Sequence, residues 1–434
     1  MNTTSEVLAD RLRAAGAGTI ELDGPGLQRY TVDGKTPALR CVPETPEQIG
    51  ALLGICAQVG AAVVPWGGGT AMGLGNIPHR ADVVLELTRF DKVIEHDAAN
   101  LTATAQAGLH LAAFQNVLGK EKQFLALDPP HPGQATLGGV VAANSNGPRR
   151  MFYGGVRDLV IGMKMVLATG EQIKAGGKVV KNVAGYDMCK LFVGSLGTLG
   201  IITEVTLKMT PLPETAATIV AAGPLAQSLE LVEALFQSVL LPAGLALISP
   251  EVAQAVGMPG GTPAVAVWAE GFSEAVARHV RDLSTLAARG GLTVEVLGAA
   301  AHERLWAHLR DFGTSDGRVV VRVTVPLGSV AAVVNAVDQW RTPDLNVQYV
   351  AHAGTGVIWV SLAPVPASAR WFPQLSALAR DHQGHAVLTS APLSMKDGVD
   401  IWGPPPASVS LMRDIKQQFD PQHILNPGRF VAGL

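Results

Sequence analysis

Hydrophobic and polar positions in the first half of the chain alternate between short apolar runs and amphipathic stretches. Residues 38–43 (ALRCVP) are typical of a buried strand. Residues 45–60 have the pattern of a helix, with Thr45 as the N-cap, Pro46 in the first turn and Gly60 at the end. Further elements are predicted as strands at 61–65, 81–87 and 92–97 and a short amphipathic helix at 110–120. This half of the chain therefore alternates strands with helices.

The pattern changes in the middle of the chain. Residues 159–170 and 201–209 form two strand patterns around a polar, glycine-rich segment, and the prolines of 210–215 (TPLPET) indicate an exit from this region. The patterns beyond it are helices at 226–240 and 272–290 and strands at 263–271, 318–326 and 356–364. They predict an α+β domain with an antiparallel sheet. Residues 402–409 then have the composition of a linker, and residues 410–430 predict a helix with a proline-rich tail.

Composition and charge narrow the class of protein. The 434 residues are enough for two or three domains, and 48% hydrophobic against 16% charged residues indicates a globular chain. The formal charge is −3 and no basic block is present, so we expect no nucleic-acid partner. The first residues lack the apolar core of a signal peptide, and no run is long and apolar enough for a membrane span. We therefore expect a cytoplasmic protein that contacts the inner membrane only through a partner.

The three cysteines are Cys41, Cys56 and Cys189. Their odd number and wide spacing match neither a disulfide framework nor a CxxC metal pair, so we expect ordinary buried thiols. Three thiols cannot supply the four ligands of an iron–sulfur cluster within one chain. Any transfer of electrons through such a cluster therefore requires a partner.

A run of glycines follows the strand at 61–65. The segment VVPWGGGTAMGLG (63–75) indicates that something approaches the main chain closely, and a phosphate is the obvious candidate. The segment lacks the lysine of a P-loop and differs from the GxGxxG of a dinucleotide fold. By spacing alone, a simple glycine turn and an anion site are about equally favoured.

Two more glycine-rich sets change this balance. Residues 128–150 combine a Pro–Pro turn, a Gly–Gly pair and two asparagines, and residues 191–205 carry glycines just before a strand. Three such loops in one half of the chain are difficult to explain as turns alone. They indicate a large, planar cofactor with several phosphates.

These segments carry a resemblance to a known family. PWGGGT, DPPHPGQATLGGVVAANSNG, VVKNVAGYDMCKLFVGSLGTLGIITEV and FDPQHILNPGRF resemble the FAD-binding domain of the vanillyl-alcohol oxidase type. They are most similar to the FAD-binding E subunit of bacterial glycolate oxidase, and the GYD…LF.GS.GTLGI pattern is shared with its catalytic D subunit. The resemblance implies an α+β fold. It would comprise two FAD-binding subdomains at 1–217, a cap with an antiparallel sheet at 218–405, and a segment at 406–434 that returns to the flavin.

The same resemblance implies a set of cofactor-binding residues. They are Pro65, Trp66, Gly67, Gly68, Gly69, Thr70, Gly73, Thr136, Gly138, Gly139, Ala142, Gly200, Ile202 and Asn426. The first loop would hold the FAD pyrophosphate, residues 136–142 the flavin and ribityl region, residues 200 and 202 the adenine or ribose side, and Asn426 the isoalloxazine. Relatives with covalent flavin use a histidine or cysteine near the first loop. Trp66 stands there, so the FAD should be non-covalent.

The residues for chemistry are less evident. Oxidation of a 2-hydroxy acid needs a cation for the carboxylate and a base for the hydroxyl proton. The polar residues near the glycine loops are Arg149, Arg150, Tyr153, Lys181 and Tyr186. Each taken alone fits a surface or packing role better than a catalytic one.

Histidines offer further candidates for chemistry. Catalytic relatives carry an HxGDGNxH strand that binds a metal, whereas here AHAGTGVIWV (351–360) keeps only His352 and the glycines. We therefore expect no metal and interpret His352 as a core histidine rather than a ligand. His382 and His385 have helical spacing but no third ligand.

Three functions remain open. The leading hypothesis is an accessory FAD subunit of a heteromeric glycolate-type 2-hydroxyacid dehydrogenase. In this complex a catalytic FAD-containing D-type subunit performs most of the chemistry on the small 2-hydroxy acid, and electrons pass to an iron–sulfur F-type subunit. The second is a self-sufficient FAD-dependent 2-hydroxyacid dehydrogenase. The third is a non-catalytic scaffold with empty glycine loops, which the three intact glycine sets argue against.

Overall fold

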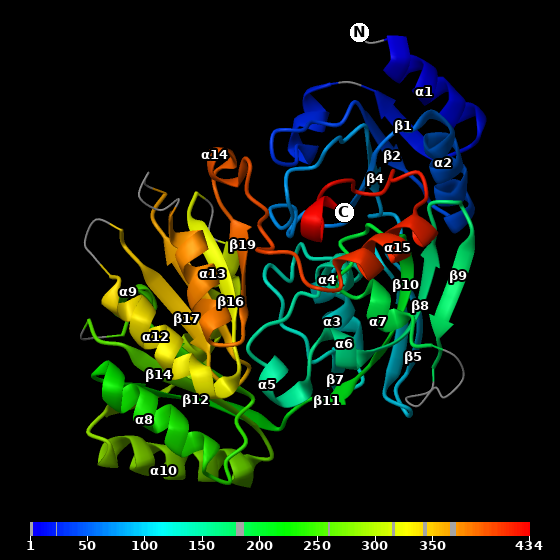
Figure 1. Cartoon of the computed structure of the whole chain (residues 1–434). Coiled ribbons are helices and arrows are strands. Elements are labelled where there is room, and N and C mark those ends of the chain that lie inside the picture. Colours follow the sequence, from blue (N-terminus) through cyan, green and yellow to red (C-terminus); the bar gives the residue numbers. More distant parts are fainter. Residues whose placement is uncertain are drawn as a thin grey trace.

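The computed structural model describes residues 3–22, 24–178, 186–258, 261–314, 317–341, 345–364 and 370–434. Its α-helices are α1 (Thr3–Ala14), α2 (Pro46–Val59), α3 (Leu111–Gly119), α4 (Leu137–Ala143), α5 (Arg150–Tyr153), α6 (Val156–Leu159), α7 (Cys189–Phe192), α8 (Leu225–Phe236), α9 (Pro250–Ala255), α10 (Ser273–Arg289), α11 (Ala299–Asp311), α12 (Val330–Gln339), α13 (Trp371–Asp381), α14 (Leu393–Lys396) and α15 (Val409–Phe419). Figure 1 shows how they surround the sheets. In the described part of the chain, no helix has the length and apolar character needed to cross a bilayer.

The strands form four sheets. They are β1 (Thr19–Leu22), β2 (Leu39–Val42), β3 (Val63–Trp66), β4 (Val83–Glu86), β5 (Val93–Asp97), β6 (Thr102–Gln106), β7 (Gln123–Phe124), β8 (Val160–Val166), β9 (Gln172–Gly176), β10 (Ile201–Lys208), β11 (Thr210–Pro211), β12 (Thr215–Ala222), β13 (Gly244–Ile248), β14 (Ala264–Gly271), β15 (Thr293–Leu297), β16 (Val319–Thr324), β17 (Gln348–His352), β18 (Val357–Leu362) and β19 (His385–Ser390). The predicted strands and helices of the first half lie where the sequence placed them.

The N-terminal subdomain is a four-stranded sheet of order β1-β2-β4-β3, in which β2, β4 and β3 run parallel. Helix α2 begins as predicted, because the Thr45 side chain accepts the N–H of Gln48, and it ends at Gly60 in the left-handed conformation. Helix α1 has no counterpart in the sequence analysis. It packs its buried Leu8 and Leu12 into the core shared with α2.

The second subdomain is an antiparallel sheet of order β5-β6-β10-β8-β9. Strands β8 and β10 pair directly, so the predicted strands on either side of the glycine-rich segment are neighbours in space. Helix α4 packs against β6 and β10. This packing places the second glycine-rich set on the side of the sheet that faces β3.

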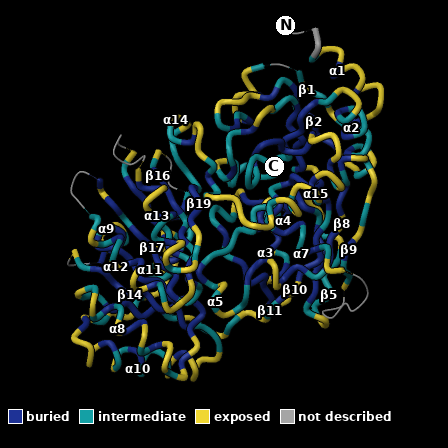
Figure 2. The backbone as a smooth tube through the Cα atoms, viewed as in Figure 1, coloured by how far each residue is buried: buried dark blue, intermediate teal, exposed yellow. Residues whose placement is uncertain are grey.

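The third region is an eight-stranded antiparallel sheet of order β15-β12-β14-β13-β17-β18-β16-β19. Helices α8, α10, α12 and α13 share the larger core on one face, and α9 and α11 share the smaller core on the other. Figure 2 shows this sheet buried between its layers, with α10 exposed at the outside. The sheet begins with β12 at Thr215, so this strand crosses the boundary expected at 217/218.

One helix of this region differs from the expected pattern. The helix expected at 226–240 ends at Phe236, because the Ser238 hydroxyl caps the carbonyl of Leu235 and accepts the N–H of Leu240. The C-terminal segment returns across the molecule. Leu425 bridges to Val63, next to the first glycine loop.

Candidate functional site

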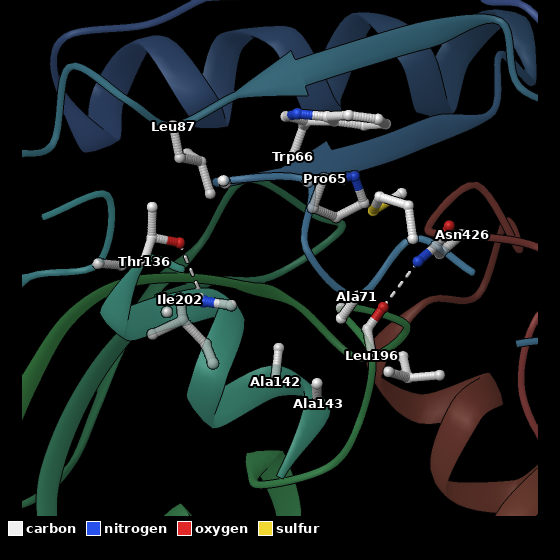
Figure 3. A pocket seen from close by; sticks show the side chains of 18 of the residues that line it. Pro65, Trp66, Ala71, Leu87, Thr136, Ala142, Ala143, Leu196, Ile202 and Asn426 are labelled. Carbon is white, nitrogen blue, oxygen red and sulfur yellow. Dashed lines mark hydrogen bonds between the residues drawn. The ribbon is translucent and has the colours of Figure 1, made fainter. Parts of the chain in front are cut away.

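A cavity lies where the end of β3, the start of α4, the loop before β10 and the returning C-terminal segment meet (Figure 3). All of the predicted cofactor residues except Gly73 line it. Gly73 lines an adjoining cavity. The structure therefore brings together residues that are spread from Pro65 to Asn426 in the sequence.

The glycines of the first loop allow this loop to pack against its neighbour. A side chain on Gly68 would overlap the carbonyl oxygen of Gln134, and one on Gly67 would overlap the Thr136 hydroxyl. Gly69 has φ 74°, and a Cβ there would lie 2.8 Å from the Trp66 ring. The sequence indicated that something lies close to the backbone of this loop. In the structure, part of that close contact is with another segment of the protein, which contains Gln134 and Thr136.

The backbone of this loop leaves donors free. The N–H groups of residues 67–71 donate to no other atom of the described residues, whereas the N–H groups of Met72 and Leu74 close turns onto the carbonyls of Gly69 and Ala71. Consecutive free N–H groups beside a cavity form a concavity that binds anions. The geometry therefore fits the pyrophosphate of a dinucleotide.

Asn426 contributes a polar atom to the same cavity. Its amide nitrogen donates to the carbonyl of Leu196 at 2.7 Å, as Figure 3 shows, and its oxygen is buried without a hydrogen-bond partner among the described residues. Such an acceptor is costly to leave unpaired, and a ligand hydroxyl or N–H would satisfy it. Arg429 also lines the cavity, and the sequence analysis missed it.

A second cavity of about 490 Å³ lies between the glycine loops and the eight-stranded sheet. It shares residues 69–71, Leu74, Gly139 and Ala143 with the first, so the two cavities adjoin. The eight-stranded sheet of the cap forms one wall of this second cavity through side chains on neighbouring strands. These are Arg322, Thr324, His352, Val357, Trp359, His385, Thr389 and Ser390.

Arg322 is the most unusual of these residues. It lies between Val321 and Val323 on β16, whose alternate side chains enter the larger core, so Arg322 points to the opposite face. Its guanidinium lies 5.9 Å from the Trp359 ring centroid and has no hydrogen bond or ion pair with any described residue. Burial, with a smaller contribution from Arg150, lowers its pKa. A charged group in an apolar strand pattern (RVVVRVTVP) was the available signal.

His352 ends β17 at the edge of this cavity. Its side chain is buried, its Nδ1 has no partner among the described residues, and burial lowers its pKa to about 4. The imidazole is therefore neutral at neutral pH. The described residues contain no group of three histidine, cysteine or acidic side chains that could hold a metal.

The histidines at 382 and 385 lie on different elements. His382 caps the end of α13, whereas His385 starts β19 and lines the second cavity. Burial and the nearby Arg322 lower the pKa of His385. His382 and His385 are therefore separated by the turn between α13 and β19 and do not lie on one helix.

The remaining candidates from the sequence have other surroundings. Arg149 pairs at 3.0 Å with the fully buried carboxylate of Glu270 and lies 4.2 Å from the ring centroid of Trp268, so it joins the FAD-binding region to the cap. Tyr153 packs edge-on against Phe124. Tyr186 is 94% exposed.

None of these three residues lines either cavity, but Arg150 lines the second. Lys181 lies outside the described residues.

The cavity fits a dinucleotide cofactor, and comparison with known proteins identifies the chain as a flavin-dependent oxidoreductase. Residues 37–176 match the family "FAD binding domain", and residues 404–430 match "FAD linked oxidases, C-terminal domain". The fold matches p-cresol methylhydroxylase with TM-score 0.75 and 16% identity, covering 99% of this chain and 97% of that one. This is the architecture of the vanillyl-alcohol oxidase type.

Curated relatives place the chain more closely. It is 31% identical to glycolate oxidase subunit GlcE of Escherichia coli, over 79% of this chain and 85% of that protein. It is 28% identical to glycolate oxidase subunit GlcD of Bacillus subtilis, over 99% and 97%. It is 27% identical to D-2-hydroxyglutarate dehydrogenase of Xanthomonas citri, over 91% and 89%. The chain belongs to this family of FAD-linked 2-hydroxyacid oxidoreductases, and FAD is its cofactor.

Proposed function

We propose that this chain is the FAD subunit of a heteromeric dehydrogenase, that it oxidises a small 2-hydroxy acid of the glycolate type, and that the electrons pass to an iron–sulfur partner. The observation that carries the proposal is the unpaired guanidinium of Arg322 in the cavity beside the cofactor site. The similarity to glycolate oxidase subunits supports the substrate class and the heteromeric assembly.

The first cavity would hold FAD without a covalent bond, because Trp66 occupies the place of an attachment residue. The free N–H groups of residues 67–71 would bind the pyrophosphate. The unpaired oxygen of Asn426 would accept a hydrogen bond from the cofactor. Bound FAD supplies the hydride acceptor of the reaction.

Arg322 would bind the carboxylate of the substrate. An isolated buried cation is unfavourable unless a counter-charge joins it, and a guanidinium can bind a carboxylate through two parallel hydrogen bonds. Arg150 lies on the opposite wall and adds positive charge. The cap thus supplies a carboxylate site next to the flavin wall.

His352 would receive the proton of the substrate hydroxyl. Burial keeps the imidazole neutral, so one ring nitrogen can accept a proton, and Nδ1 has no competing partner among the described residues. His352 is buried, as the sequence analysis expected, and it also lines the second cavity, where a substrate would lie.

Electrons must leave through another protein. The three cysteines of the chain are free and buried, and a four-thiolate cluster needs one more ligand. An iron–sulfur subunit of the F type, together with a D-type FAD subunit, is the partner set that we propose. Contact with the membrane would come through these partners on the cytoplasmic side.

The test is anaerobic reduction of the purified chain. We expect a yellow protein whose flavin absorbance bleaches with glycolate or D-lactate, and we expect Arg322→Met to stop the bleaching while FAD stays bound. Arg304→Met is the matched control, because Arg304 is an exposed arginine on α11 that lines neither cavity.

Three results would change the proposal. A flavin that stays oxidised in the wild-type chain would assign substrate oxidation to the D-type partner. A colourless protein that does not take up added FAD would favour the scaffold hypothesis. Bleaching followed by steady turnover with a soluble dye, without partners, would favour the self-sufficient enzyme.

A further inference from the structure

Three consecutive carbonyl groups of the first glycine loop are held by buried cations. Arg429 donates from one guanidinium nitrogen to the carbonyls of Met72, at 2.7 Å, and of Leu74. The Lys396 ammonium donates to the carbonyl between them, that of Gly73, at 3.2 Å. The loop segment 72–74 is therefore fixed from the side that carries its carbonyl oxygens.

The two cations come from different parts of the molecule. Arg429 belongs to the returning C-terminal segment, and its side chain is 2% exposed. Lys396 ends α14 of the cap, which lies beside the N-terminal subdomain in Figure 1, and its side chain is 1% exposed. The loop that faces the cofactor cavity is thus held by the cap as well as by the returning C-terminal segment.

The cluster contains more positive than negative charge. Asp33 pairs with Lys396 and is the carboxylate that acts on both cations. Asp400 accepts hydrogen bonds from the Asn76 side chain and from two backbone N–H groups, and it forms no ion pair with Lys396 or Arg429 and shifts the pKa of neither. Lys396 and Arg429 carry two positive charges and Asp33 carries one negative charge, so the cluster has one excess positive charge beside the loop. The Nε of Arg429 also lacks a partner among the described residues.

We propose that Lys396 and Arg429 are positioning residues for the cofactor: they orient the first glycine loop, and the excess positive charge of their cluster with Asp33 attracts the FAD pyrophosphate. This inference depends on the proposed placement of the pyrophosphate at residues 67–71. A negative charge on the loop compensates the buried positive charge, and the interaction is little screened by water in such a buried place. Binding of FAD therefore also tightens the contact between cap and loop.

The experiment measures FAD affinity in the apo protein by quenching of flavin fluorescence. Lys396→Met removes the positive charge and keeps the length of the side chain. We expect FAD to bind on the order of tenfold more weakly, because the lost charge is buried and only a few ångströms of loop would separate it from the pyrophosphate. Lys396→Arg should retain near wild-type affinity. ADP as a competitor should lose affinity by a similar factor, whereas adenosine, which lacks the pyrophosphate, should not.

Asp33→Asn separates an electrostatic role from a purely structural one. The variant breaks the same buried ion pair, so it lowers the melting temperature, but it increases the excess positive charge. FAD affinity should therefore stay the same or increase. Arg149→Met is the matched control, since it breaks another buried ion pair between cap and FAD-binding region and should leave FAD affinity within about twofold.

Several outcomes would overturn the inference. Unchanged FAD affinity in Lys396→Met, or an equal loss in Asp33→Asn, would show that the charge does not act on the cofactor. Should Lys396→Met fail to fold, Asp33→Asn decides, because a loss of affinity there contradicts the proposal. Failure of the wild-type chain to bind either FAD or ADP would instead overturn the placement of the cofactor itself.

Discussion

The two adjoining cavities have walls that are built in different ways. The wall from the FAD-binding region is mainly backbone, with free N–H groups at residues 67–71 and small residues at 138–143. The wall from the cap consists of side chains on strands β16 to β19, with Arg322 and His352 among them. A backbone wall suits a cofactor that is the same in every relative, whereas a side-chain wall can change with the substrate while the sheet is kept. Under the proposed function, one wall would hold the cofactor and the other would select the substrate.

The largest expected effect concerns the backbone wall. In Gly68→Ala the new methyl group overlaps the carbonyl oxygen of Gln134, so the two loops must separate. We expect a loss of at least about 3 kcal/mol of stability, at the upper end of overpacking effects, together with loss of FAD. Urea denaturation and the ratio of flavin to protein after purification measure both. Full flavin content with unchanged stability would show that this wall is less closely packed than described.

The next effect concerns the joint between the walls. Arg149→Met leaves the carboxylate of Glu270 buried and unpaired, and we expect a loss of about 3–5 kcal/mol in urea denaturation. The double variant with Glu270→Gln should recover much of this loss. No recovery would indicate that the stacking of Arg149 on Trp268 provides most of the stabilisation.

A pH-dependent effect concerns the side-chain wall. The pKa of His352 is about 4 in the folded chain because of burial, against about 6.5 in an unfolded chain. Between these values the unfolded state binds more protons, so this histidine makes the protein less stable as the pH falls, by up to about 3 kcal/mol.

The test compares wild type with His352→Gln at neutral pH and near the lower pKa. The variant should lose less stability on acidification. Asp128 is buried, which raises its pKa to about 7, and it acts in the opposite direction, but it is present in both proteins and cancels in the difference. Equal acid sensitivity of the two proteins would contradict the assignment.

The smallest expected effect is that of a substitution at Gly73, which lies in the same loop as Gly68 but is not closely packed. A Cβ on Gly73 would have only the carbonyl oxygen of Thr389 nearby, at 3.8 Å, and the residue does not need a left-handed conformation. Gly73→Ala should therefore change stability by less than about 1 kcal/mol, since Gly to Ala at a compatible position is near neutral or stabilising. It should also retain FAD, and thermal melting with flavin content tests this. A loss as large as that of Gly68→Ala would mean that the whole loop, rather than its packed part, tolerates no side chain.

Much of the backbone wall could be predicted from the sequence because its signals are local. The Thr45 cap and the Gly60 end of α2 are such local signals, and both were confirmed. The glycine runs are also local and line the first cavity, whereas their binding of the cofactor stays a prediction. The reason for the glycines was only partly foreseen, because the packing of Gly68 against Gln134 depends on two loops that are far apart in the sequence.

The residues of the side-chain wall could not be predicted from local signals in the sequence. Arg322, Trp359, His352 and His385 become neighbours only through the register of four strands, and no pattern in the sequence gives that register. Arg322 therefore escaped attention, while Arg149, which is next to a glycine loop in the sequence, was selected and proves to join two regions. Proximity along the chain was a useful guide to the residues that line the first cavity and a poor one to those that line the second.

The bridge between Val63 and Leu425 has a consequence for biosynthesis. The N-terminal subdomain leaves the ribosome long before Asn426 and Arg429 are translated, yet both of these residues line the cofactor cavity. During most of synthesis the nascent chain therefore exposes the glycine loop with its free N–H groups and without its last wall. FAD loading is then expected to be a late event, after residue 429 has emerged, rather than a nucleus around which the first subdomain folds.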